Sequence, residues 1–293
     1  MTKPYYMKSL LRGGVGRHNF WTTGDDKEFF HWPLPQVDRP GDWLDDKKTG
    51  PLIPHRSGFN LSPLHCVLQY LSTENYLAEA DGETAEAHDC VVARRVRLIR
   101  PLPVTPQQWR KLGYEYALTA RNVLAEIDSV RPYLEENLDK ITGAFDKAAA
   151  VFHLDVSQDT LQAAVANAQV ELQPQIWRFA HDIPSSGLYA APAKASMHAT
   201  EALSTALSLM CMDDSQLNHA QTVKDIAYKT REAAAEVADD YVEHRGRVEP
   251  PHGLVSITGA PLLDGDTPDS FPRAVRHALF KAQNDKLLRI FKL

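Results

Sequence analysis

Residues 90–109, CVVARRVRLIRPLPVTPQQW, contain the change of pattern that decides the fold. The first ten residues are rich in valine and are typical of a β-strand. Proline then occurs three times within six residues. Thr105 followed by Pro106 is typical of a helix start, with a capping residue and then a proline at the first helical position. The sequence therefore predicts a small α+β domain over residues 1–103 and a mainly α-helical domain over residues 104–293.

Upstream of this stretch, short runs with strand character alternate with turns rich in proline and glycine. Strands are expected at residues 29–32, 75–80 and 90–99. One short helix is expected at residues 63–70, with Ser62 as its candidate cap. These elements together predict an α+β module.

Downstream, apolar residues recur at helical spacing. The expected helices begin after Thr105, extend over residues 133–152 and 159–179, occupy most of residues 192–245 with a joint near 213–215, and resume at Ser270. The density of alanine in 192–245 favours close helix packing. An irregular segment rich in glycine and proline is expected near residues 246–272.

Composition limits the class of protein. The chain has 293 residues, of which 43% are hydrophobic and 24% charged, as is usual for a folded domain protein. No apolar run reaches the ~20 residues that span a bilayer, and the N-terminus lacks the pattern of a signal peptide, so a cytoplasmic location without membrane contact is expected. Three cysteines give no disulfide framework.

Charge is distributed unevenly along the chain. Residues 1–103 carry 13 basic and 13 acidic side chains, and the remaining residues carry 19 and 25, so the formal net charge of −6 belongs to the second domain. Proteins that bind nucleic acid normally concentrate positive charge on one surface. The sequence therefore disfavours nucleic acid as a partner.

Several short motifs occur in the first domain in an order that is similar to that of a known family. The motifs are Trp32-Pro33-Leu34-Pro35, Pro40-Gly41-Asp42-Trp43, Gly58-Phe59-Asn60-Leu61, Pro63 to Cys66, Tyr76 to Glu83 and Val91 to Arg100. Over roughly residues 8–103 the chain resembles an uncharacterised family of small bacterial and phage domains of unknown function. The resemblance implies a phage, prophage or other mobile-element setting, and thus the host cytoplasm. The chain departs from the family at Asn60, where members usually carry histidine.

Histidines and cysteines around residues 52–71 and 88–90 raise the hypothesis of a metal site or a nucleophilic cysteine. The candidates are His55, His65, Cys66, His88 and Cys90. Adjacent or alternate residues do not chelate one ion easily, and zinc sites have a different ligand spacing. A nucleophilic Cys66 or Cys90 would need an activating partner for which the sequence shows no recognised spacing. No metal site is predicted, and Cys66 is expected to be buried with His65 exposed.

A glycine-rich stretch, LRGGVGRHNFW at residues 11–21, could suggest a phosphate-binding loop. It lacks the lysine and serine or threonine that such a loop places on phosphates and a metal ion. A strand and turn are expected here.

An enzymatic alternative is an ADP-ribosyltransferase-like activity in the first domain. Such enzymes use an arginine or histidine on an early strand, then a serine or threonine, and then a glutamate that stabilises the ribose during cleavage of NAD. Arg12 or His18, Ser72 and Glu79 occur in this order. This alternative requires NAD, whereas the main interpretation requires no cofactor.

The main interpretation is a protein that acts by binding a macromolecular partner, either another protein or a second copy of itself. Tryptophan, tyrosine and arginine are enriched among residues that dominate binding energy. The candidate contacts are Trp21, Trp32, Trp43, Tyr76, Arg95 and Arg97. Packing in the core is the competing role for at least two of the aromatic residues.

Overall fold

The computed structural model describes residues 4–16, 30–130, 135–154, 156–181, 190–215, 218–243 and 270–293. Its contacts divide the chain into two units. The sheet unit contains Met1–Thr105 and Asn284–Leu293, and the helical unit contains Pro106–Gln283. An antiparallel sheet region is followed by a mainly helical region, which confirms the predicted fold class.

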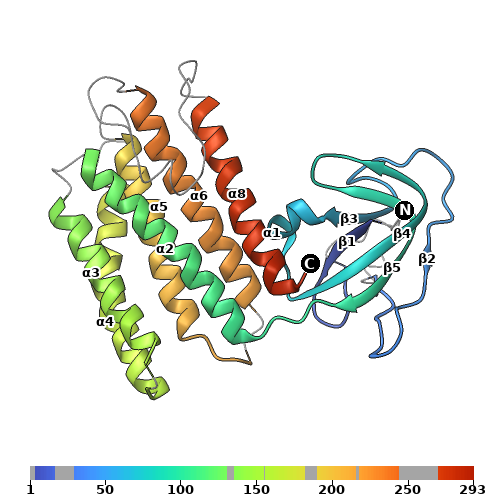
Figure 1. Cartoon of the computed structure of the whole chain (residues 1–293), viewed down its shortest axis with the longest axis horizontal. Helices are drawn as coiled ribbons and strands as arrows, with labels where there is room; N and C mark the ends of the chain where they lie inside the picture. Colours follow the sequence, from blue (N-terminus) through green and yellow to red (C-terminus); the bar gives the residue numbers. More distant parts are fainter. Residues whose placement is uncertain are drawn as a thin grey trace. The chain divides into compact units, whose positions relative to one another are not determined.

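The sheet unit is built from five strands (Figure 1). They are β1 (Tyr5–Leu10), β2 (Leu44–Asp45), β3 (Phe59–Pro63), β4 (Glu74–Glu86) and β5 (Val91–Pro101). The strand order is β2-β5-β3-β1-β4, and β4 also pairs with β5. Strands β1, β3, β5 and β4 therefore form a closed antiparallel ring, to which the short strand β2 is added along β5.

Closure of so few strands requires strong bending of the long strands. Two register shifts interrupt the pairing of β4 with β5, one between Leu77 and Ala78 and one between Asp81 and Thr84. Irregularities of this kind bend and twist a strand. They allow β4 to pair with β1 on one edge and with β5 on the other.

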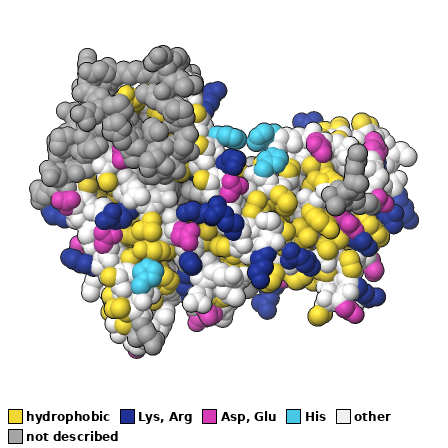
Figure 2. Space-filling model, viewed as in Figure 1, with side chains coloured by type: hydrophobic (Ala, Val, Ile, Leu, Met, Phe, Trp, Pro, Cys, Tyr) yellow, Lys and Arg dark blue, Asp and Glu magenta, His cyan; other side chains and the backbone are white. Residues whose placement is uncertain are grey.

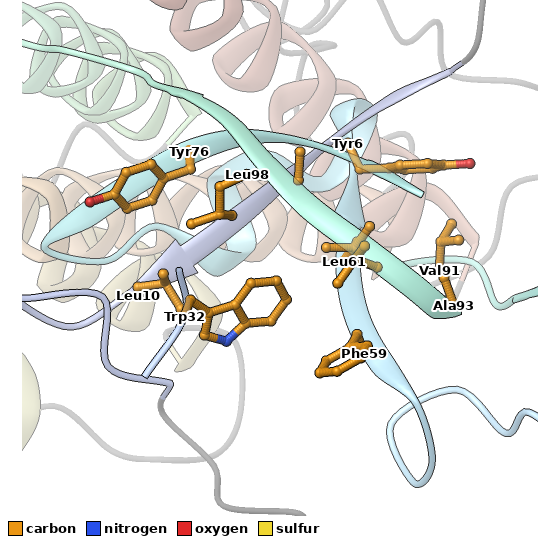
Figure 3. Close-up of a cluster of buried hydrophobic side chains, with 11 residues drawn as sticks. Tyr6, Leu10, Trp32, Phe59, Leu61, Tyr76, Val91, Ala93 and Leu98 are labelled. Atoms are coloured by element: carbon orange, nitrogen blue, oxygen red, sulfur yellow. The ribbon is translucent and has the colours of Figure 1, made fainter. Parts of the chain in front are cut away.

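The interior of the ring is filled by buried apolar and aromatic side chains (Figure 3). They are Tyr6, Leu10, Trp32, Phe59, Leu61, Tyr76, Ala78, Val91, Ala93, Val96 and Leu98. The rings of Trp32 and Phe59 meet edge to face with their centroids 5.6 Å apart. Trp32 reaches this position from a segment that the sequence analysis assigned to a strand and that makes only an isolated bridge, Val15 with His31.

A short helical segment connects β3 to β4. It consists of η1 (Leu64–Cys66) and α1 (Val67–Tyr70), inside the expected range of residues 63–70. Ser62 is not its cap, because Ser62 belongs to β3 and Pro63 takes the capping position without a side-chain hydrogen bond. The side chain of Asn284 bonds to the backbone of this segment instead. Its Oδ1 accepts a hydrogen bond from Leu68 N and its Nδ2 donates one to Leu64 O, both at 2.9 Å.

The helices follow the expected periodicity closely. They are α2 (Pro106–Val130), α3 (Glu135–Phe152), α4 (Gln158–His181), α5 (Ala190–Met210), α6 (His219–Glu243) and α8 (Ser270–Phe291). Helix α8 is divided between the units, with Asn284 and later residues counted in the sheet unit. The expected irregular segment near 246–272 lies mostly outside the described residues.

The core of the helical unit is formed by α2, α5 and α6, whose buried faces are dominated by alanine, leucine and valine. A buried polar group lies within it: Tyr116 Oη donates to Gln283 O at 2.6 Å, and Arg231 Nη1 donates to Gln283 Oε1 at 2.8 Å. Among the described helices, none has the length and apolar character needed to cross a bilayer.

Candidate functional site

Asn60 organises the turn that the sequence analysis singled out. Its side-chain Oδ1 accepts hydrogen bonds from His55 N at 2.8 Å and from Cys90 Sγ at 3.1 Å. Its backbone oxygen accepts from Lys8 Nζ at 2.9 Å. His55 has a φ of 63°, which is uncommon for a residue other than glycine, and the bond to Asn60 fixes it there. In this chain, Asn60 on β3 therefore links β1 to the turn at His55 and to Cys90, the residue that precedes β5.

Lys8 is a charged residue whose side chain lies among the apolar residues of the ring. It shares its strand face with Tyr6 and Leu10, both of which belong to the interior cluster. Lys8 Nζ lies 4.7 Å from the centroid of the Trp32 ring. Burial lowers the pKa of Lys8 to about 8, and the nearby Cys90 opposes this shift. Lys8 was not among the predicted site residues, because no strand was expected at residues 5–10.

The histidines and cysteines near this turn are used in local hydrogen bonds. His55 Nε2 lies 3.0 Å from Asp89 Oδ1, and His65 Nε2 lies 2.9 Å from His88 O. Within the described residues, no three histidine, cysteine or acidic side chains are grouped so that they could hold a metal ion. Cys66 is buried and His65 exposed. Burial raises the pKa of the Cys66 and Cys90 thiols, which favours the unreactive protonated form.

Residues 11–15 of the glycine-rich stretch form a tight turn that binds a carboxylate of the same chain. Gly13 and Gly14 both have φ of +76°, and their N–H groups donate to Glu74 Oε1 at 2.9 Å and Oε2 at 3.1 Å. Successive N–H groups in such a turn form an anion-binding concavity. Here Glu74 occupies it, as a phosphate group would in a phosphate-binding loop.

The residues of the NAD alternative are placed separately in the sheet unit. Arg12 is exposed in the glycine turn, and Ser72 is 1% exposed between α1 and β4. Glu79 is bonded to Arg97, its cross-strand neighbour. His18 lies outside the described residues. Within the part of the chain that the structure describes, no hydrogen bond or ion pair joins Arg12, Ser72 and Glu79, and this alternative stays a prediction.

One group of predicted contact residues does converge on the outside of the sheet, and we call it the Arg–Trp surface. It consists of Trp43, Arg95 and Arg97 with the carboxylates of Asp45, Glu79 and Asp81. Arg95 Cζ lies 4.6 Å and Arg97 Cζ 4.5 Å from the centroid of the Trp43 ring. The partly exposed indole is thus in contact with two guanidinium groups, and cation–π attraction stabilises such contacts.

Each guanidinium of this surface is also bonded to acidic side chains. Arg95 Nε lies 3.2 Å from Asp45 Oδ1, and Arg95 Nη1 lies 3.2 Å from Asp81 Oδ2. Arg97 forms an ion pair with Glu79. Arg95 with Asp81 and Arg97 with Glu79 are direct cross-strand partners of β5 and β4. These pairs fix the rotamers of long side chains that would otherwise be mobile.

The other predicted contact residues lie elsewhere. Trp32 and Tyr76 are 5% and 7% exposed and belong to the interior of the ring (Figure 3). Both therefore pack in the core, which was the alternative role expected for at least two of the aromatic residues. Tyr76 Oη donates to Glu74 at 2.8 Å, which connects the interior to the glycine turn. Trp21 lies outside the described residues.

A pocket that the sequence analysis did not identify lies at the start of α2 in the helical unit. It has a volume of about 970 Å³ and is lined by Gln107, Gln108, Arg110, Lys111, Tyr114, Glu115, Phe152, His153 and Asp214. Arg110 bonds to Asp214 and to Met212 O. His153 meets the Tyr114 ring edge-on at 4.8 Å. The lining residues come from three segments that are far apart in the sequence, so no local sequence motif predicts this pocket.

Comparison of the chain with protein-family models, with curated proteins and with solved structures finds no match.

Proposed function

We propose that this protein acts by binding a macromolecular partner of protein nature through the Arg–Trp surface. The observation that carries the proposal is the contact of the Trp43 indole with both the Arg95 and the Arg97 guanidinium groups. Tryptophan and arginine are the residue types most enriched where protein interfaces gain their energy. Because these three side chains are already fixed, binding would immobilise few additional rotamers and so cost little entropy.

The charge of this surface supports a protein partner rather than a nucleic acid. Three of the four arginines of β5 are matched by carboxylates: Arg94 with Asp46, Arg95 with Asp45 and Asp81, and Arg97 with Glu79. Figure 2 shows both charge signs interspersed with apolar side chains on the visible face of the sheet unit. A phosphate backbone would require these ion pairs to be broken, whereas a mixed polar and apolar protein surface would not.

The biological setting of the proposal rests on the family resemblance. Small domains with the same order of motifs are scattered through bacteria and their phages, so we propose an accessory role in a phage or similar mobile element, within the host cytoplasm. The partner would then be a host protein or a protein encoded by the same element.

The experiment is a quantitative capture of proteins from bacterial lysate on the immobilised full chain. Trp43→Ala should reduce recovery of the specific partner at least 10-fold, because truncation of a central tryptophan typically costs more than ~2 kcal/mol of binding. Val37→Ser is the matched control, since Val37 is fully exposed on the same unit. Circular dichroism of the Trp43→Ala variant checks that the sheet is retained.

The proposal fails if the folded Trp43→Ala variant captures the same proteins in the same amounts as the unchanged chain. It also fails if Val37→Ser loses the partner to the same extent, because binding would then depend on general surface hydrophobicity.

A further inference from the structure

Helix α4 carries an exposed apolar stripe in addition to its buried face. The buried residues are Leu161, Val165, Ala168, Leu172 and Phe179, and α4 packs against α3 and α5. The exposed residues are Ala163, Ala166, Val170, Pro174 and Trp177. At 3.6 residues per turn, the exposed set lies within an arc of about 80°, on the side of the helix opposite to the buried set.

The exposure of this stripe is large for such residues. Val170 is 74% and Trp177 59% exposed. A helix on the surface of a bundle normally has one apolar face and one polar face. A second apolar face on an edge helix (Figure 1) is the pattern of a helix that packs on both sides.

The stripe is complementary to itself when two copies of α4 are placed antiparallel. If the two-fold axis passes through Val170, residues whose numbers sum to 340 face each other. The large Trp177 of one copy then lies over the small Ala163 of the other, and Pro174 lies over Ala166. A large side chain entering the space beside a small one is the usual way in which helices interlock.

Polar side chains at the two ends of the stripe support the same arrangement, because an imidazole can donate a hydrogen bond to a carboxylate. Asp159 and His181 are exposed near the two ends of the stripe, and their numbers also sum to 340. Each copy would therefore place its Asp159 opposite His181 of the other copy, once on each side of the axis. The acidic residue lies in the first turn of α4 and the histidine in the last.

We infer that α4 is the self-association surface of this protein and that its occupant is α4 of a second copy, antiparallel, with the two-fold axis at Val170. Such an interface is isologous, so it closes as a dimer and does not extend into a filament. One helix face is small beside a standard interface of ~1,600 Å², so the dimer should be reversible, with a dissociation constant on the order of micromolar. This inference does not depend on the Arg–Trp surface.

The first experiment is sedimentation of the full chain over a concentration range from about 1 to 500 μM, a range chosen to span the affinity expected of a small interface. The unchanged protein should pass from monomer to dimer. Trp177→Ala should raise the dissociation constant at least 10-fold, and Ala163→Trp should do the same by filling the space that receives Trp177. Tyr228→Ala is the matched control, because Tyr228 is a 53% exposed aromatic on α6 of the same unit.

The second experiment tests the register. Val170→Cys places one thiol from each copy beside the two-fold axis, so mild oxidation should give a disulfide-linked dimer. Glu171→Cys, turned away from the axis, should cross-link much more slowly. Cys66 and Cys90 are buried and Cys211 is partly exposed, so each cysteine variant is compared with the unchanged chain.

A monomer at every concentration would overturn the inference, and so would a dimer that Trp177→Ala does not weaken. Cross-linking through Glu171→Cys as fast as through Val170→Cys would overturn the antiparallel register.

Discussion

Lys8 shows how one residue can place a charge in an otherwise apolar interior. Its Nζ lies over the Trp32 ring and donates a hydrogen bond to the Asn60 carbonyl at 2.9 Å. A lysine buried in this way holds its proton less strongly, and a lowered lysine pKa also makes the amine more reactive near neutral pH. Asn60 also makes several contacts from one position, since its single side-chain oxygen accepts hydrogen bonds from both His55 N and Cys90 Sγ.

The titration of Lys8 should be visible in the pH dependence of stability. Burial lowers its pKa from 10.5 to about 8, so between these pH values the unfolded chain holds a proton that the folded chain has released. The free energy of unfolding should therefore rise with pH across this interval, relative to Lys8→Met. Below about pH 8 the folded and the unfolded chain both hold the proton, so the free energy of unfolding stays lowered by the full cost of burying the charged amine.

Urea unfolding of both proteins at several pH values from 7 to 10.5 measures this difference. Lys8→Met also loses the bond to Asn60 O, but that loss does not vary with pH. A constant difference between the two proteins over the whole range would contradict the burial of a charged Lys8. The Nζ resonance of Lys8, assigned through its absence in Lys8→Met, should titrate at about pH 8.

At the scale of elements, the helices were predicted well and the strands only in part. Apolar periodicity marked α2 to α6 and α8 because each helix buries one long stripe. Strand β1 was missed, since YYMKSL carries a lysine and a serine where alternation was sought, although Lys8 does point inward. Strand β2 has two residues, and β3 contains a serine and ends in proline, so neither has a local signal; both exist because β5 offers edges to pair with.

The Arg–Trp surface was predictable in its residues but not in its geometry. Alternation on a strand places Arg95 and Arg97 on one face, and the sequence analysis selected both. Trp43 lies about fifty residues earlier, and the pairing of Leu44 and Asp45 with β5 brings its ring into contact with both arginines. Pairings between such distant segments depend on tertiary contacts that no local pattern encodes.

The glycine turn provides a test of element geometry with a matched pair of variants. Gly13 and Gly14 have the same φ of +76°, so alanine at either position should cost about 1–2 kcal/mol of stability for the left-handed conformation. At Gly13 the added Cβ meets nothing within 4 Å, whereas at Gly14 it would lie 2.7 Å from Leu34 Cδ2 and 3.1 Å from Trp32 O. Gly14→Ala should therefore be the more destabilising by a further ~1–3 kcal/mol.

Chemical denaturation of both glycine variants measures the difference. Equal losses of stability would mean that the turn does not pack against Trp32 and Leu34 as described.

At the scale of the whole molecule, the sheet unit is completed by residues from the far end of the chain. The division of contacts assigns Asn284–Leu293 to this unit, whereas the sequence analysis ended the first domain at residue 103. The amide of Asn284 is 1% exposed and binds the backbone of Leu64 and Leu68, more than 200 residues earlier. An asparagine on an amphipathic helix gives no sequence signal for a partner at this separation.

Asn284→Ala should destabilise the sheet unit, because it removes both hydrogen bonds and leaves the buried Leu68 N–H without its acceptor. The expected loss is about 2–4 kcal/mol, since each lost bond to a buried group costs ~1–3 kcal/mol. Arg289→Ala, at an exposed position of the same helix, is the control and should change stability by less than ~0.5 kcal/mol. Hydrogen exchange gives a local measurement: Leu68 N–H should lose protection in Asn284→Ala and keep it in Arg289→Ala. If Leu68 exchanges at the same rate in both variants, the last residues of the chain do not complete the sheet unit, and residues 1–105 would then have to satisfy the start of α1 by themselves.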